Sequence, residues 1–260
     1  MPLGVLLNGI DTFILVFVRM TGLFVAAPIF GRRNIPGYLK VGFSFLTALI
    51  LINVLEVPEK DLQQNLYLFA FLVIKEFLVG LTVGYVAYLI FTAIYIAGQL
   101  IDMRIGFGMV NVLDPMSNIQ IPITANFYFI MSMLVFLSVN GHHLLIKGLF
   151  DSYKFIPIGN VVIGEAAVND IVRIFGSTFI IGFKIAAPVT AAVMVADVAL
   201  GVIARTVPQL NVFVVGMPLK IAVGIIVMLL TIPMFLMLLN AIFRSMDSEI
   251  IRFMKDLAPK

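Results

Sequence analysis

The chain has 260 residues, of which 62% are hydrophobic and 12% are charged, and its formal net charge is +3. An ordinary soluble domain is about 45–50% apolar and about 25% charged, so this composition excludes a soluble globule and indicates an integral membrane protein. The absence of Cys excludes disulfide scaffolds and thiolate chemistry, and the dispersed Lys and Arg residues form no basic block, so nucleic acid is not an expected partner.

Six apolar segments follow one another and predict an all-α protein of membrane helices. They cover residues 3–30, 41–55, 66–101, 119–146, 174–196 and 212–243. A spanning helix needs about 20 residues, so the second segment is too short to cross a membrane by itself. Lys184 and Lys220 lie in the last two segments and Pro218 and Pro233 in the sixth, and we expect both to bend or break.

One membrane domain is expected over residues 1–260, ending in a charged tail at 244–260. In this tail charged residues alternate with Ile250, Ile251, Phe253 and Leu257, which predicts an amphipathic helix at the membrane interface or on a partner. Lys and Arg divide almost evenly between alternate loops, so they indicate no orientation in the membrane.

Charged residues inside apolar segments are the first candidates for function. They are Asp11, Arg19, Lys75, Glu76, Lys184 and Lys220. If these residues form a relay for protons or ions, the chain is a transporter. If they lie near helix ends or pair across a subunit interface, their role is structural. We favour the structural interpretation, because the sequence shows no acidic array repeated in two halves.

Residues 99–115 join two strongly apolar segments and are themselves apolar, yet they contain Gly106, Gly108 and Asn111. Irregular backbone at membrane depth is tolerated only inside protein or beside a water-filled path. The composition fits two structures equally well, a hydrophobic gate and an ordinary interfacial turn that ends at Asp114.

No enzyme motif is present. His142 and His143 lack further ligands for a metal, and we expect them to form a polar helix cap. The sequence contains no phosphate-binding loop, nucleophile elbow or dinucleotide fingerprint, so neither catalysis nor a cofactor is expected.

Segment 197–220 contains the mixed polar run Pro-Gln-Leu-Asn-Val-Phe at 208–213, which has no general use in membranes. This segment resembles the signature of the FliR/SctT family of type III secretion export-gate proteins. Weaker matches follow in the same order along the whole chain, at Arg19 with 27–31, Glu76 with Gly80 and Gly84, 97–98 with Asp102, 114–115, 140–142 and 157–159.

The resemblance implies bent helical hairpins that assemble with FliP and FliQ into a helical export gate, with FlhB at its entrance. The gate would lie in the bacterial inner membrane, within the flagellar basal body, and would pass unfolded flagellar subunits. The plug that closes the pore in this family corresponds here to Gly106, Phe107, Gly108, Met109, Val110, Val112 and Leu113. Aromatic residues that are common in the family's plug are replaced by Met109 and Val112.

The resemblance also marks polar residues that we expect to join elements or subunits. They are Arg19, Glu76, Asp102, Asp197, Arg205, Gln209 and Asn211. Two alternatives stay open: a virulence injectisome gate with different cargo, and a solitary transporter that uses Lys184 or Glu76 as its ion site.

Overall fold

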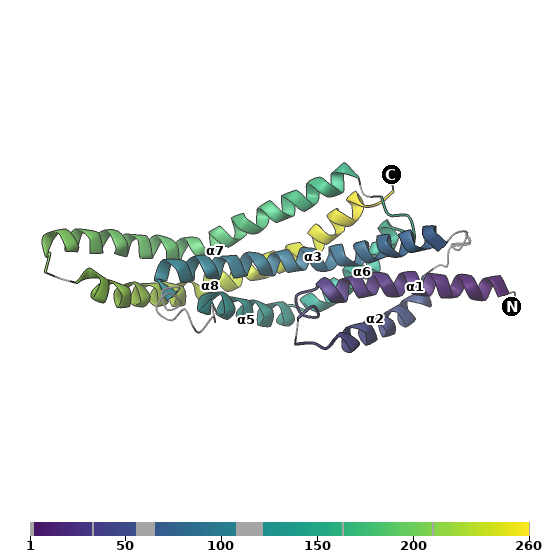
Figure 1. Cartoon of the computed structure of the whole chain (residues 1–260), viewed down its shortest axis with the longest axis horizontal. Helices are drawn as coiled ribbons and strands as arrows, with labels where there is room; N and C mark the ends of the chain where they lie inside the picture. The colour runs from purple at the N-terminus through teal and green to yellow at the C-terminus, as the bar shows by residue number, and fades with distance from the viewer. Residues whose placement is uncertain are drawn as a thin grey trace. The chain divides into compact units, whose positions relative to one another are not determined.

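The computed structural model describes residues 3–32, 34–55, 66–107, 122–162, 164–209 and 211–259. These residues form seven α-helices and contain no strand (Figure 1), which confirms the predicted all-α class. The helices are α1 (Leu3–Ala26), α2 (Gly37–Ile52), α3 (Leu66–Ile105), α5 (Ile123–Ser138), α6 (Gly141–Phe155), α7 (Glu165–Thr206) and α8 (Val212–Asp256).

Four helices of the described chain are long and apolar enough to cross a membrane: α1 over Gly9–Ala26, and α3, α7 and α8. The consecutive helices α5 and α6 together make up a possible fifth, broken span. With 16 residues, α2 is shorter than a spanning helix, as its segment predicts. The prediction of an integral membrane helical protein is therefore confirmed.

The last two helices are longer than the apolar segments that predicted them. They have 42 and 45 residues. α7 adds charged turns on both sides of segment 174–196, and α8 adds charged turns after segment 212–243. Neither helix breaks at its prolines, although α7 contains Pro188 and α8 contains Pro218 and Pro233. Proline is tolerated inside membrane helices because neighbouring groups satisfy the freed backbone carbonyl.

The fourth apolar segment is divided between two helices. α5 ends at Ser138, and α6 begins at Gly141 after Asn140, whose φ of 57° lies in the left-handed region. Asn is one of the few residues with a side chain that enters this region readily. The sequence pattern, which shows only apolar length, did not reveal this break.

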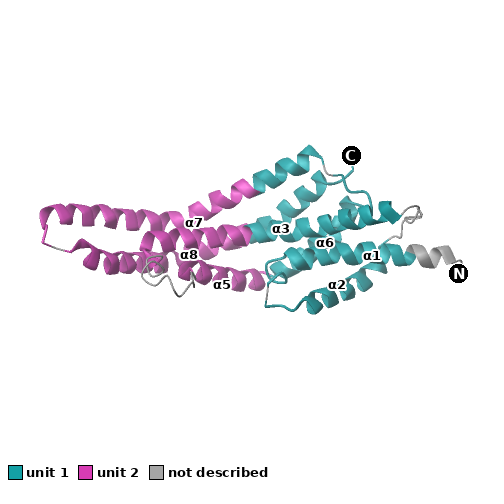
Figure 2. Cartoon of the chain, in the orientation of Figure 1, with its two compact units in different colours: residues 1–89, 140–174, 243–260 teal, residues 90–139, 175–242 magenta. Residues whose placement is uncertain are grey.

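The chain forms two compact units (Figure 2). Unit 1 comprises residues 1–89, 140–174 and 243–260, and unit 2 comprises residues 90–139 and 175–242. Helices α3, α7 and α8 contribute residues to both units. Unit 2 has an aromatic core in which Phe91 contacts Phe129 and Phe136 with ring centroids 5.5 Å apart, and Tyr128 stacks on Phe235 at 4.4 Å.

The C-terminal tail packs inside unit 1. Phe243, Met246, Ile250 and Phe253 are buried at helical spacing, and the Val162 amide donates to the Leu257 carbonyl at 3.1 Å. The tail is therefore amphipathic, and its apolar face packs on the chain itself. That the tail also lies at the membrane interface or on a partner stays a prediction.

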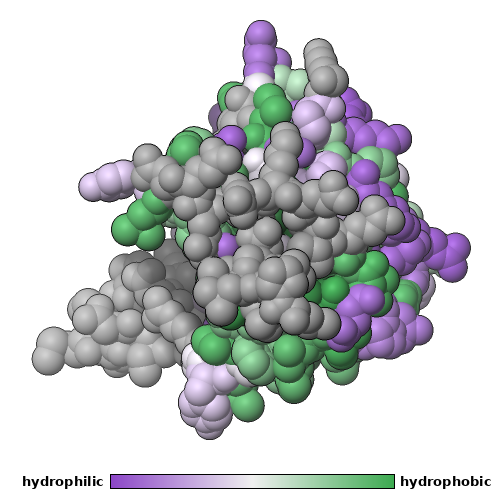
Figure 3. All heavy atoms as spheres, turned by 90° about the vertical axis from the view of Figure 1, so that its right-hand side faces the viewer, coloured by the Kyte–Doolittle hydropathy of each residue, from purple (hydrophilic) through white to green (hydrophobic). Residues whose placement is uncertain are grey.

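Both units expose large apolar side chains outside these cores. In unit 1, Tyr38, Leu66 and Tyr67 are between 74% and 83% exposed, and in unit 2 Leu230 and Met237 are 75% and 73% exposed. Figure 3 shows hydrophobic and hydrophilic surface side by side on one face, with the hydrophilic residues gathered mostly toward the right of the view. Such exposed apolar area fits lipid or partner subunits rather than water.

Candidate functional site

A buried ion pair joins α1 and α3 in unit 1. Arg19 Nε lies 2.5 Å from Glu76 Oε2, and both side chains are 0% exposed. The second carboxylate oxygen, Oε1, accepts a hydrogen bond of 2.8 Å from the Gly159 amide. Because an unpaired charge in such surroundings is costly, these bonds fix the positions of the segments that supply them.

The remaining donors of Arg19 reach the end of α6. Arg19 Nη1 donates to Ser152 Oγ and to the Ile156 carbonyl, each at 3.1 Å, and Nη2 donates to the same carbonyl at 3.2 Å. The guanidinium carbon lies 4.0 Å from the centroid of the Tyr153 ring. One arginine thus connects α1, α3 and α6. The sequence pointed to Arg19 and Glu76 but not to Ser152 and Tyr153. These two residues lie in α6, where no motif distinguishes them from their neighbours.

Close packing of α1 on α3 brings the ion pair together. A Cβ atom added at Gly80 would overlap the backbone carbonyl of Arg19, and one added at Gly84 would lie 2.7 Å from the Ala26 Cβ. Gly22 faces α3 in the same way, since a Cβ there would lie 2.5 Å from the Phe77 carbonyl oxygen. The Gly80 and Gly84 spacing therefore serves helix packing.

Asp102 caps α5 in unit 2. Its carboxylate accepts hydrogen bonds from the Thr124 amide at 3.0 and 3.1 Å and from the Ala125 amide at 3.4 Å. A carboxylate at a helix N-terminus satisfies amides that lack intrahelical partners and complements the helix dipole. Asp102 thereby holds the last turn of α3 against the first turn of α5.

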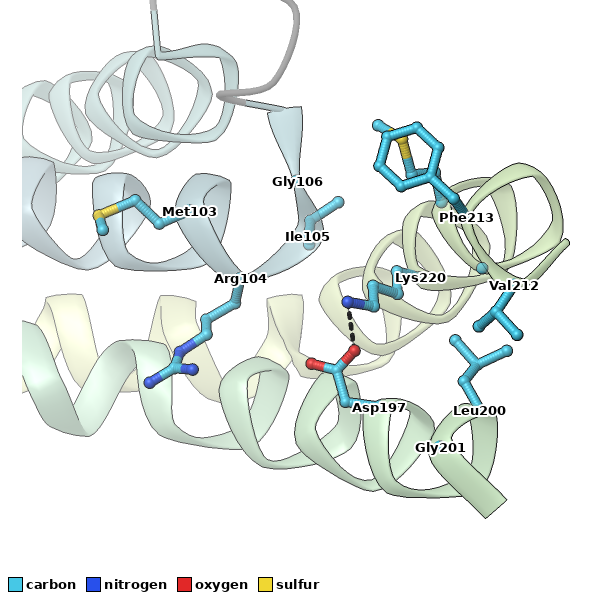
Figure 4. A pocket seen from close by; sticks show the side chains of 12 residues that line it. Met103, Arg104, Ile105, Gly106, Asp197, Leu200, Gly201, Val212, Phe213 and Lys220 are labelled. Carbon is cyan, nitrogen blue, oxygen red and sulfur yellow. Dashed lines mark ion pairs between the residues drawn. The ribbon is translucent and has the colours of Figure 1, made fainter. Parts of the chain in front are cut away.

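A pocket of about 510 Å³ lies in unit 2 where α3 ends beside α7 and α8 (Figure 4). An ion pair between Lys220 of α8 and Asp197 of α7 lines it. Leu200, Val212 and Phe213 add apolar surface. The pocket thus gathers both ends of the 197–220 signature segment.

The predicted plug begins at this pocket. Gly106 lines it and has a φ of 97°, which favours glycine, while Phe107 is partly buried. The other predicted plug residues, Gly108, Met109, Val110, Val112 and Leu113, lie outside the described residues. The assignment of the seal therefore stays a prediction.

The last three predicted joint residues lie at the surface. Arg205 is exposed in the last turn of α7, and Gln209 is exposed between α7 and α8. Asn211 is exposed too, and its Oδ1 accepts hydrogen bonds from the Phe213 amide at 3.2 Å and the Val214 amide at 3.4 Å. Asn211 thus caps the start of α8. The role of Arg205, Gln209 and Asn211 as joints between subunits stays a prediction.

A charged network that the sequence did not reveal ties α7 to α8 in unit 1. Arg173 Nη2 lies 2.6 Å from Glu249 Oε2, and Arg173 Nε lies 3.0 Å from Asp170 Oδ1. Arg252 approaches the same Asp170 oxygen at 3.5 Å. The three-residue spacing of Asp170 and Arg173 on a helix was the available signal.

The two histidines lie in the first turn of α6, with ring centroids 4.2 Å apart. The residue at the cap position is Asn140, whose carbonyl accepts from the His143 amide at 2.9 Å, so the expectation that the histidines form the cap was wrong. No group of three His, Cys, Asp or Glu side chains in the described part of the chain is placed to hold a metal ion.

The long apolar helices and the fully buried ion pair define a helical protein embedded in a membrane. The family described as "Bacterial export proteins, family 1" matches residues 10–246, so the chain belongs to this family. It is 40% identical to the flagellar biosynthetic protein FliR of Bacillus subtilis over 235 residues, which cover 89% of this chain and 90% of that protein.

Other relatives carry the same name. FliR of Pectobacterium carotovorum is 32% identical over 88% of this chain and 87% of its own length. FliR of Escherichia coli is 27% identical over 96% of this chain and 94% of its own length. The resemblance to the FliR/SctT family is confirmed, and the chain is a membrane-embedded component of a flagellar export apparatus.

Proposed function

We propose that the chain is a structural and gating subunit of the flagellar type III export gate in the bacterial inner membrane, within the basal body. It forms the gate with FliP and FliQ, with FlhB at the entrance, and unfolded flagellar subunits pass through. The observation that carries this proposal is the family match over residues 10–246, which extends from α1 into the last turns of α8.

The gating element of this proposal is the segment that follows α3. Gly106 adopts a left-handed conformation at the edge of the pocket, which supports its use as a hinge. The apolar residues at 107, 109, 110, 112 and 113 close the path by excluding water, and movement about Gly106 and Gly108 opens it. No catalytic residue takes part.

The buried polar residues act as joints in this proposal. Arg19 and Glu76 fix α1, α3 and α6, and Asp102 fixes α3 and α5. This arrangement disfavours Glu76 as the ion site of a solitary transporter, because the residue is 0% exposed and both carboxylate oxygens are occupied. The flagellar names of the relatives favour flagellar over injectisome cargo.

Purification of the chain from mild detergent, with and without FliP and FliQ, tests the proposal. We expect the chain to be recovered in one large, defined particle that contains both partners, and to be unstable when it is expressed without them. A stable, monodisperse chain that ignores FliP and FliQ would contradict the proposal and return attention to the solitary transporter.

A further inference from the structure

The structure divides the charged residues of the apolar segments into two classes. Arg19 pairs with Glu76, Lys220 pairs with Asp197, and Lys75 Nζ donates to the Val161 carbonyl at 3.1 Å. Asp11 is only 2% exposed. Lys184 differs from all of these, since it is exposed and makes no ion pair or hydrogen bond with any residue that the structure describes.

The position of Lys184 along α7 makes this exposure costly. It lies in the middle of the 23 residues at 174–196, which contain no other charge. At about 1.5 Å per residue this run is about 35 Å long, close to the thickness of a bilayer core, and Lys184 lies about 15–18 Å from either end. The lysine side chain is much shorter than this distance, so it does not snorkel to the interface from there.

The surface around Lys184 is apolar. Ile180 and Phe183 on α7 are 57% and 66% exposed. Met234 of α8, which lines a small cavity together with Lys184, is 63% exposed. Ala187, one turn further along α7, is exposed as well. This face therefore suits contact with lipid or with another apolar helix everywhere except at the ammonium group.

The chain itself offers the ammonium little solvation. Lys184 lines a cavity of about 20 Å³ together with Tyr128 and Thr231, and the Thr231 hydroxyl donates to the Val227 carbonyl at 2.9 Å. Such a cavity has room for about one water molecule, whereas an ammonium group carries three donors. The remaining acceptors must come from outside the described chain.

We propose that the face of α7 around Lys184 binds an apolar helix of another subunit, and that an Asp or Glu on this helix pairs with the Lys184 ammonium. The apolar side chains bury against the partner helix, and the carboxylate supplies the missing acceptor and neutralises the charge. The inference rests on the proposed function, because it requires that the chain assembles with other membrane subunits.

Charge variants of the tagged, full-length chain in its native bacterium test the pairing. Each variant is purified in mild detergent, and the amount of partner subunits recovered per chain is measured. We expect Lys184→Glu to lower this amount at least ten-fold, Lys184→Met to lower it several-fold, and Lys184→Arg to stay within two-fold of the wild type. Full recovery of partners with Lys184→Glu would overturn the inference.

Lys154→Glu is the matched control, because Lys154 has a side chain 76% exposed and lies outside the uncharged run. It makes the same charge reversal and should leave partner recovery unchanged. If the wild-type chain itself is recovered without partners, the proposed function fails. If the wild type and Lys184→Glu are both recovered in the particle, only the present inference fails.

A photoreactive amino acid in place of Ala187 provides a measurement that keeps Lys184 intact. We expect an adduct with another membrane subunit of the particle, and its attachment site should lie within about one helical turn of an Asp or Glu. Adducts confined to lipid, to a second copy of this chain or to export cargo would each overturn the inference, the last by assigning Lys184 to a water-filled path.

Discussion

Arg19 illustrates how one buried residue organises a membrane-embedded fold. Its guanidinium contacts Glu76, Ser152, Ile156 and Tyr153, which come from two separate parts of the sequence, both far from Arg19 itself. A paired buried charge contributes little net stability, but an orphaned partner is strongly destabilising. The cluster therefore acts mainly by penalising every arrangement in which α1, α3 and α6 are not together.

Removal of either partner should destabilise the chain. We expect Glu76→Gln or Arg19→Met to lower the free energy of unfolding by about 3–5 kcal/mol, since each leaves a buried ionic group unpaired. The double variant Arg19→Met/Glu76→Met should recover part of this loss because no charge remains. Unfolding of the purified complex at increasing concentrations of a denaturing detergent measures these differences in free energy.

The surface pair of Lys154 and Asp151 is a suitable control for this series, because the Lys154 side chain is 76% exposed. Lys154→Met should change stability by less than about 1 kcal/mol. An unchanged stability for Glu76→Gln together with lost transport would instead mark Glu76 as an ion site.

The sequence identified the members of this cluster only in part. Arg19 and Glu76 were prominent because ionisable residues are rare in apolar segments. Their pairing was not readable, since 57 positions separate them and the other ligands of Arg19 lie more than 130 positions away. Lys184 was equally prominent in the sequence, and the structure distinguishes it from the paired residues by its exposure and by the absence of an ion pair with the described residues.

At the scale of elements, the contact between α1 and α3 depends on glycine. The backbone of Arg19 lies directly over Gly80, so no side chain fits between the two helices at this point. The same closeness places the Arg19 side chain within reach of Glu76, which lies one turn before Gly80 on α3. Packing and pairing are therefore coupled in this part of unit 1.

Gly80→Ala should separate α1 from α3 and destabilise the chain by several kcal/mol, because the added Cβ overlaps backbone and not a flexible side chain. Gly42→Ala in α2 is the matched control: no heavy atom lies within 4 Å of its added Cβ. This control should be neutral or stabilising by up to about 1 kcal/mol. The free energies of unfolding of the two variants are measured and compared. Equal values would contradict the close contact between the Arg19 backbone and Gly80.

Element boundaries were less predictable than the existence of the elements. Hydropathy located α7 and α8 but began α7 too late and ended α8 too early, because these two polar ends pair with each other through Arg173 and Glu249. The same signal joined α5 to α6, since one left-handed residue at Asn140 changes the backbone direction without changing the hydropathy. Hydropathy reports apolar length, whereas helix length also depends on tertiary partners.

At the scale of the whole molecule, composition alone was sufficient to predict an all-α membrane protein, and the run at 208–213 pointed to the correct family. The division into two units was not readable from the sequence. Each unit combines stretches that are far apart in the chain, and no linker or change of composition marks where one unit ends.

The plug prediction belongs at this scale because its readout is the tightness of an assembled gate. Deletion of residues 106–113 should make the resting membrane permeable to small solutes while the particle still assembles. Ion or small-solute leakage into cells or vesicles, measured beside partner recovery, tests this. Normal assembly with an ion-tight membrane would refute the seal assignment.

The composition of unit 1 has a consequence for the order of biosynthesis. Its last piece is 243–260, whose Ile250 packs near Gly148 of α6 and whose Leu257 carbonyl accepts from Val162. This piece emerges from the ribosome after the other pieces of unit 1, so unit 1 is completed only once residues 243–260 have been made. A chain cut before Ile250 would leave the apolar core of unit 1 uncovered and become a target for membrane proteases.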